Sequence, residues 1–215
     1  MTKTAHKHPM RFDDPLTLFP WAMTRLFSLW VSQTYPFSLV GSNLSIHYTV
    51  LLDRRMATAF RIGNSVKVRK DAWLNTFDLT GANDELRIVI EDNCVIGART
   101  VISAKNMIHI EHDVLIGSSV LIQDHNHAYE NLNLPIRAQG LTPGGSIRIE
   151  HSCCISPGVA IVSPQGELVM GHNCVVAPNA VVTRSFPPYS LVGGNPARVL
   201  EQLDPSKTES LACLG

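Results

Sequence analysis

The sequence lacks an excess charge of either sign, and it has few charged residues. Lys and Arg total 18 and Asp and Glu total 18 among 215 residues, so the net charge is zero with histidine neutral. A neutral chain offers no basic groove, and we expect no nucleic-acid partner. Charged residues make up 17%, below the roughly 25% of typical soluble domains. A surface this poor in charge suggests that part of it is buried in an oligomer.

Cysteine pairs and the common nucleophile and phosphate-binding motifs are also missing. None of the five cysteines forms a CxxC pair, which indicates free, mostly buried thiols in a reducing compartment. We therefore expect a cytoplasmic protein, with its inner-membrane face as a second location. There is no Gly-x-Ser-x-Gly elbow and no Gly-Lys phosphate loop, which argues against those hydrolases and nucleotide-binding enzymes.

The chain has no long uninterrupted hydrophobic run. Residues 15–37, PLTLFPWAMTRLFSLWVSQTYPF, are rich in Leu, Phe and Trp, but Pro20 and Arg25 interrupt them. They fall short of the roughly 20 apolar residues of a spanning helix. We interpret them as a helical arm within an N-terminal segment of residues 1–45. The arm either packs on its own domain or a partner subunit, or lies on a membrane surface. The first residues lack a signal-peptide layout.

What the sequence does contain is a repeat of six. Aliphatic residues recur at steps of six in four segments, and a weaker copy precedes them at 62, 68 and 74; the positions are 90, 96, 102; 110, 116, 122; 149, 155, 161; and 170, 176, 182. A helix would show steps of three and four, and a single strand steps of two. The period predicts an all-β solenoid in which three strands and three corners make one coil of 18 residues.

The repeat also predicts which side chains point inward. The aliphatic position of each six should stack on its equivalent in the next coil. Small residues in the fifth place should point inward near the corners; they are Cys94, Thr100, Val114, Val120, Cys153, Val159, Cys174 and Ala180. We therefore interpret Cys94, Cys153 and Cys174 as buried structural residues. The solenoid domain is expected over residues 46–203, followed by a polar tail at 204–215.

One long insertion breaks the repeat. The step from Ile122 to Ile149 is 27 residues, and it begins QDHNHAY. Loops that leave a rigid scaffold commonly carry function, and a loop of this length is usually functional or disordered. We expect residues 124–148 to be extruded from the solenoid as an active-site loop.

The repeat, the loop opening DHNHAY…PIRAQG and the ending VVTRSFPPYSLVGGNPARVL together resemble the hexapeptide-repeat acyltransferases. The likeness spans about residues 46–200 and is greatest to bacterial sugar O-acetyltransferases of the galactoside, maltose and colanic-acid types. The resemblance implies a left-handed parallel β-helix and a homotrimer with active sites between subunits. It also implies acetyl-CoA or another acyl-CoA as co-substrate, no required metal, and a saccharide or glycan acceptor.

The resemblance also assigns residues. The family's catalytic histidine corresponds to His127, and its CoA-contacting residues correspond to Thr183, Arg184 and Arg198. Backbone contacts with CoA are expected near Pro157 and Pro178. Acyl transfer to a hydroxyl needs a base, and neutral imidazole suits that role near pH 7. We assign acceptor contacts to His125, Asp124 and Tyr129, and the alternative for His125 is that it shapes the site. Asp124, Glu130 or a backbone carbonyl would orient the His127 ring. Arg184 and Arg198 would meet phosphates; the alternative is that they are solvated surface charges.

Three other functions remain open at this level. The first is N-acylation of an amino sugar, and the second is a non-catalytic trimeric scaffold. The third is a zinc lyase resembling the γ-class carbonic anhydrases, which use histidines five positions apart; no two of the nine histidines have that spacing. His112, His151 and His172 share one place in their coils, which predicts a stacked column along a corner. That column is either a polar corner or a metal site.

Overall fold

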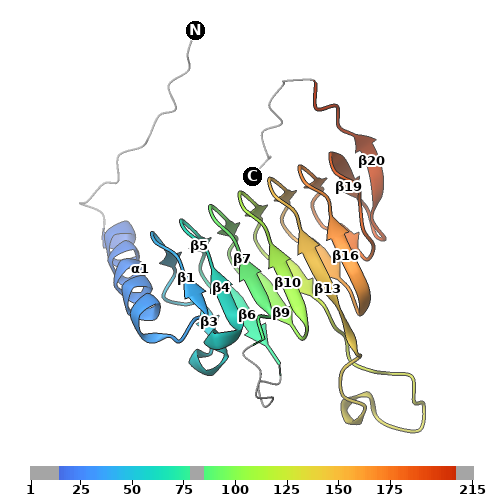
Figure 1. Cartoon of the computed structure of the whole chain (residues 1–215), viewed down its shortest axis with the longest axis horizontal. Coiled ribbons are helices and arrows are strands. Elements are labelled where there is room, and N and C mark those ends of the chain that lie inside the picture. The colour runs from blue at the N-terminus through green and yellow to red at the C-terminus, as the bar shows by residue number, and fades with distance from the viewer. Residues whose placement is uncertain (1–14, 78–84, 207–215) are drawn as a thin grey trace.

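The computed structural model describes residues 15–77 and 85–206. Successive short strands belong to three sheets in turn, and the chain winds in stacked turns along one axis (Figure 1). Sheet A contains β1 (Leu39–Val40), β4 (Phe60–Ile62), β7 (Ile88–Ile90), β10 (Met107–Ile110), β13 (Gly144–Ile149) and β16 (Gln165–Met170). Neighbouring strands within it are parallel.

The other two sheets form the remaining sides of the prism. Sheet B contains β2 (Ser45–Ile46), β5 (Lys67–Val68), β8 (Val95–Ile96), β11 (Leu115–Ile116), β14 (Cys154–Ile155), β17 (Val175–Val176), β19 (Ser190–Gly193) and β20 (Arg198–Gln202). Sheet C contains β3 (Leu51–Leu52), β6 (Trp73–Thr76), β9 (Val101–Ala104), β12 (Leu121–Gln123), β15 (Ala160–Val162) and β18 (Val181–Val182). One passage through sheets A, B and C is called a coil below.

The core confirms the sixfold repeat. The aliphatic positions predicted to point inward are at most 2% exposed. They also stack as predicted: Ile90 pairs with Ile110, Ile110 with Ile149, and Ile149 with Met170. Each such side chain is worth about 1.5–3 kcal/mol when buried. A coil cannot bury this row alone, so each coil depends on its neighbours.

The corners explain the rest of the six-residue unit. The fifth-place residues, including Cys94, Cys153 and Cys174, are buried as predicted. The fourth place takes a left-handed backbone conformation in many hexads, and there the residue is mostly Asn, Asp or Ser, as at Asn93, Asp113 and Ser152. Short polar residues tolerate that conformation better than most others because their side chains bond the local backbone.

The stack begins earlier than we expected. β1 starts at Leu39, before the boundary at residue 46, and the first coil places Val40, Ile46 and Leu52 in the sixfold positions. The step of six is present in the sequence, but Val40 lies in the segment that we gave to the arm. A 3-10 helix, η1 (Arg54–Ala59), connects this coil to the next.

The loop is shorter than we expected. Residues 144–148, which we placed in the extruded loop, belong to β13 and pair with residues 165–169 of β16. The long β16 strand provides hydrogen-bond partners for them, so their backbone groups are satisfied in sheet A. The segment that leaves the stack is therefore residues 124–143.

The two ends of the stack are covered differently. Helix α1 (Pro15–Thr34) packs on the first coil, where the Ser28 hydroxyl bonds both the N–H and the C=O of Ile46. At the other end β20 pairs antiparallel with β19 after a turn that contains Gly194, at φ 96°, and the cis bond before Pro196. Within the described residues, no helix is long and apolar enough to cross a membrane. Residues 207–215 of the expected tail lie outside the described part.

Candidate active site

The loop leaves the stack through a narrow antiparallel neck. Asn126 and Thr142 are joined by the bond from Thr142 N to Asn126 O at 2.8 Å, and Ala128 N donates to Gly140 O at 3.0 Å. The backbone of His127 forms an isolated bridge with Leu141 inside this neck. The Thr142 hydroxyl accepts a further bond from Asn126 N. The neck fixes the backbone on both sides of His127.

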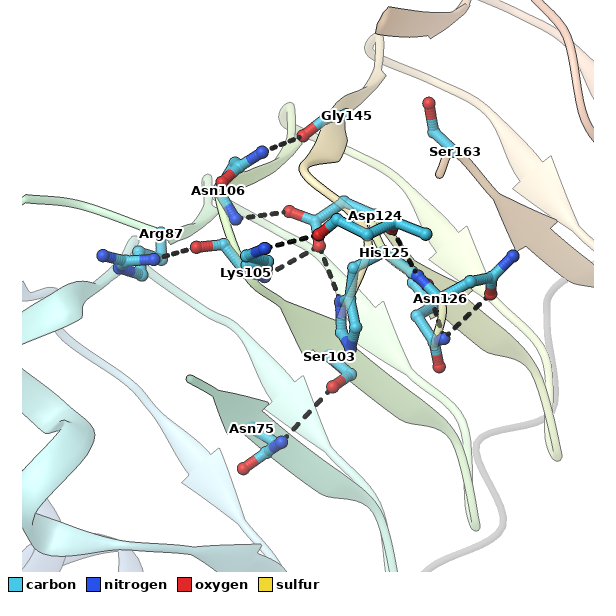
Figure 2. Close-up of polar contacts among 12 residues, drawn as sticks. Asn75, Arg87, Ser103, Lys105, Asn106, Asp124, His125, Asn126, Gly145 and Ser163 are labelled. Atoms are coloured by element: carbon cyan, nitrogen blue, oxygen red, sulfur yellow. Dashed lines mark hydrogen bonds and ion pairs between the residues drawn. The ribbon is translucent and has the colours of Figure 1, made fainter. Parts of the chain in front are cut away.

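Asp124 anchors the neck to the stack (Figure 2). Its side chain is fully buried, and its carboxylate accepts the backbone N–H groups of Lys105, Asn106 and Met107 at 2.7, 2.8 and 2.9 Å. Charge-assisted bonds of this kind are stronger than neutral ones. Asp124 therefore joins the start of the loop to the turn between β9 and β10.

His125 lies on the inner side of this anchor. Its Nδ1 is 2.9 Å from Asp124 Oδ1, its ring meets Phe77 edge to face at 4.6 Å, and it is 3% exposed. Figure 2 shows the ring directed toward Ser103, whose hydroxyl accepts a bond from Asn75. We expected Asp124 and His125 to contact the acceptor. Both are buried, and both oxygens of Asp124 are already occupied, so within this chain neither side chain has surface for a saccharide.

His127 and Tyr129 face the solvent. His127 is exposed, and no hydrogen bond to its ring is found within residues 15–77 and 85–206. The hydrogen-bond partners expected to orient the His127 ring are therefore not seen. Asp124 binds His125 instead, and Glu130 is an exposed residue of the loop. Tyr129 is 64% exposed. Of the two histidines, His127 is the one that a substrate can reach.

The outer part of the loop is held by its own polar contacts and exposes apolar side chains. Gln139 Nε2 donates to the carbonyls of Asn131 and Leu134, and Asn131 N donates to Gln139 Oε1. A short 3-10 helix, η2 (Ile136–Ala138), precedes Gln139. Leu132 is 93% exposed, and Leu134 and Ile136 are about half exposed. Such a cluster is typical of a surface that contacts another molecule.

Sequence reasoning missed the residues that hold the loop from below. Lys105 Nζ donates to Thr142 O, and Asn106 Nδ2 donates to the carbonyls of Pro143 and Gly145. The sequence does contain a sign of this turn, since two extra residues separate Ile102 from Ile110. That the turn holds the loop depends on its contact with Asp124, which the repeat does not encode.

The residues expected to contact CoA lie at two corners of the prism and on β20. Ile122 pairs with Ile161, and Ile161 with Val182, so Thr183 and Arg184 leave sheet C at the same corner as Asp124, two coils further along. Both are exposed, and the Arg184 guanidinium lies 5.4 Å from the centre of the Phe186 ring. Arg198 begins β20 at the end of sheet B and is also exposed.

Pro157 and Pro178 lie at the corner between sheets B and C, one coil apart. A cavity of about 320 Å³ runs beside Pro157 and is lined by Gly97, Gly117, Ser156 and Leu115 among others. The glycines bring the coils close together, since a Cβ on Gly117 would lie 2.6 Å from Pro157 N. This groove runs along sheet B to the corner after it, which is a different corner from that of His127.

The histidine column forms as predicted, and its geometry favours the polar-corner interpretation. The rings of His112, His151 and His172 stack in parallel with centroids 4.9 Å apart, and Tyr189 closes the column edge-on. Each Nδ1 faces the side chain of the next residue. Parallel rings aim their nitrogens side by side and not at one point. Within the described residues, no group of three or more His, Cys, Asp or Glu could hold a metal ion.

Comparisons with known proteins place the fold. No protein-family model and no curated protein sequence matches this chain. Among solved structures, AntD, an N-acyltransferase from Bacillus cereus in complex with dTDP and 3-hydroxybutyryl-CoA, is 17% identical with a TM-score of 0.67, over 82% of this chain and 89% of that one. This chain has the fold of that acyltransferase.

Two further structures extend the likeness. A hexapeptide-repeat acetyltransferase from Vibrio cholerae, complexed with acetyl-CoA, is 20% identical with a TM-score of 0.51, over 89% of this chain and 92% of that one. A maltose O-acetyltransferase from Clostridium difficile is 19% identical with a TM-score of 0.51, over 90% and 91%. The neighbours include both N- and O-acyltransferases, and two of these three structures hold an acyl-CoA. At such identities the likeness establishes the fold and not the reaction.

Proposed function

We propose that this protein is an acyltransferase that moves an acyl group, most simply acetyl, from acyl-CoA to a hydroxyl of a saccharide or glycan. The observation that carries the proposal is the placement of His127. It is an exposed imidazole whose backbone is fixed in the neck, and the neck is anchored to a rigid stack by Asp124. A base held on rigid elements is what catalysis of proton transfer needs.

In the proposed reaction, His127 takes the proton of the acceptor hydroxyl as the oxygen attacks the thioester carbonyl carbon. The C–S bond then breaks, and the CoA thiolate takes the proton from the imidazolium. His127 returns to its neutral state, and no acyl-enzyme is formed. A backbone N–H at the coil edge would stabilise the oxyanion. Asp124 and His125 act as positioning residues, a revision of the acceptor contact that we expected for them.

We further propose a left-handed β-helix that assembles as a homotrimer with the site between subunits. Two features support this. His127, Thr183 and Arg184 lie at one corner of the prism, whereas Pro157 and Pro178 lie at another. The loop also exposes Leu132, Leu134 and Ile136, which a neighbouring subunit would bury. A neighbour's groove would then face the loop and hold the pantetheine arm.

N-acylation is the second candidate function. The neighbour with the higher TM-score is an N-acyltransferase solved with dTDP-4-amino-4,6-dideoxyglucose and CoA. An amine acceptor is a better nucleophile than a hydroxyl once it is neutral, so it depends less on a strong base. The two candidates therefore differ in the acceptor that supports turnover and in how far turnover depends on His127.

The test is a thiol-release assay with acetyl-CoA and a panel of sugars and amino sugars. We expect acceptor-dependent release that falls a hundredfold or more in His127→Ala, about the low end for loss of a general base. His112→Ala, an exposed histidine on the column, is the matched control and should retain activity. Turnover with amino sugars alone would select N-acylation. If no thiol is released and calorimetry detects no CoA binding, the remaining hypothesis is a non-catalytic scaffold protein.

A further inference from the structure

The exposed side of α1 is apolar although α1 already buries its opposite side. Phe19, Leu26 and Trp30 lie at helical positions i, i+7 and i+11, so they form one stripe. They are 62%, 63% and 51% exposed. Ser28, on the opposite side, is 4% exposed against the first coil. Packing on the chain's own core therefore accounts for the Ser28 side of α1 and not for this stripe.

The same end of the molecule is strongly basic, although the whole chain is neutral. Residues 15–76 contain two acidic residues, Asp53 and Asp71, and seven basic ones: Arg25, Arg54, Arg55, Arg61, Lys67, Arg69 and Lys70. Residues 77–215 have the opposite balance, with eight basic and fourteen acidic residues. The charge of the chain is thus divided along the stack.

The basic residues lie on different sides of the first two coils. Arg61 is on sheet A, Lys67 is on sheet B, Arg69 and Lys70 follow at the next corner, and Arg54 is on η1. All of them are exposed. Thr24 of α1 lines the same cavity of about 460 Å³ as Lys67, Arg69 and Lys70, and none of the described residues that line it is acidic. α1 and these three basic residues therefore border one cavity. Arg61 borders a different one, which Glu91, Asp92 and Asp113 also line.

We propose that this end of the stack docks on an anionic lipid bilayer surface. Trp and Phe favour the membrane interface, and a helix with an apolar stripe lies in it without spanning it. Basic residues near an anionic surface each strengthen binding about fivefold. The stack would stand with α1 on the lipid, and β20 at its far end would point away from it (Figure 1).

Pairing with a second copy explains the surface less well. A symmetric end-to-end dimer would place the same basic residues against each other, since such an interface uses one patch twice. Like charges facing each other oppose that contact. An anionic surface suits both features at once, the apolar stripe and the positive charge of Lys67, Arg69 and Lys70 beside α1. Docking of this kind is independent of the proposed acyl transfer.

Vesicle sedimentation with the full chain, without acyl-CoA or acceptor, tests the proposed docking on an anionic bilayer. We expect binding to vesicles of equal phosphatidylcholine and phosphatidylglycerol, weak binding to phosphatidylcholine alone, and loss of binding in 0.5 M salt, where the Debye length falls below roughly 5 Å. Leu26→Ser/Trp30→Ser should lower the affinity at least tenfold. Lys67→Gln/Arg69→Gln should lower it by about thirtyfold, two charges' worth.

Matched variants keep the test specific. Val199 and Leu200 are 43% and 62% exposed at the far end of the stack, so Val199→Ser/Leu200→Ser removes comparable apolar surface and should bind vesicles normally. Arg137→Gln/Arg184→Gln removes two exposed charges elsewhere and should also bind normally. Equal binding to neutral vesicles, or equal loss in the controls, would overturn the proposal. So would a change of oligomeric mass in Leu26→Ser/Trp30→Ser with no vesicle binding by the wild type, which would assign the stripe to a second copy.

Discussion

The Nδ1 atom of His125 lies 2.9 Å from Oδ1 of Asp124, and both side chains are buried where the loop leaves the stack. The two residues of this pair have different structural roles. Asp124 satisfies three backbone donors of the preceding turn, and His125 fills the space beside Phe77. The base proposed for the reaction, His127, follows two residues later on the outside.

Replacing Asp124 should destabilise the protein strongly. Asp124→Ala leaves the partly buried N–H groups of Lys105, Asn106 and Met107 without their acceptor, and an unsatisfied group costs about 1–3 kcal/mol when it is fully buried. Because water reaches these donors in part, we expect the free energy of unfolding to fall by about 2–3 kcal/mol in urea denaturation. Asp124→Asn retains one acceptor oxygen and should lose less. Equal losses of under 1 kcal/mol in both variants would show that the anchor is unimportant.

Glu111 should make stability depend on pH. Burial alone would raise the pKa of Glu111, but the bonds from Arg148 and from His151 N, with the charge of Arg148, hold the pKa below its usual value. A lowered folded-state pKa contributes stability above the unfolded pKa of about 4.3 and loses it as pH falls through the folded pKa. The stability gap between wild type and Glu111→Gln should thus be about 1–3 kcal/mol at pH 7 and should shrink toward pH 3. A gap independent of pH would contradict this.

Arg184 should affect the use of acyl-CoA more than the chemical step. A charge-assisted bond to phosphate is worth about 1.5–3 kcal/mol, so Arg184→Ala should raise KM for acetyl-CoA about tenfold or more with a small change in kcat. Arg184→Lys keeps the charge and should recover part of the loss. Arg137→Ala, in the loop, is the control. A fall in kcat with unchanged KM would place Arg184 elsewhere in the mechanism.

Gly97 should not accept a side chain. A Cβ there would lie 2.1 Å from Gly117 O and 2.3 Å from Gly117 C in the next coil, so backbone atoms of that coil would have to shift. We expect Gly97→Ala to cost about 2–3 kcal/mol, at the upper end of overpacking effects. Ser118→Ala, a neighbouring change that adds no atoms, should stay within about 0.5 kcal/mol. Thermal unfolding of the two variants measures the difference, and similar melting temperatures would argue against the close approach.

Much of the fold could be read from particular residues. The spacing of six that separates Ile90, Ile96 and Ile102 recurs in later coils. It predicted the stacking of the coils, the buried cysteines and the histidine column. The first coil was missed although Val40, Ile46 and Leu52 keep the step of six, because Val40 was given to the arm. The loop end was misplaced because residues 144–148 pair with β16, and a strand partner is not visible in an insertion.

The sequence by itself determined the repeating architecture and the place of the loop. A coil buries its aliphatic row only against an equivalent row, so the requirement is written as a strict period. Only the tertiary structure decided which histidine is buried and which is exposed. His125 and His127 are chemically alike and two residues apart. Their difference arises because Asp124 binds backbone donors of a turn 17–19 residues earlier, a contact that side-chain patterns do not record.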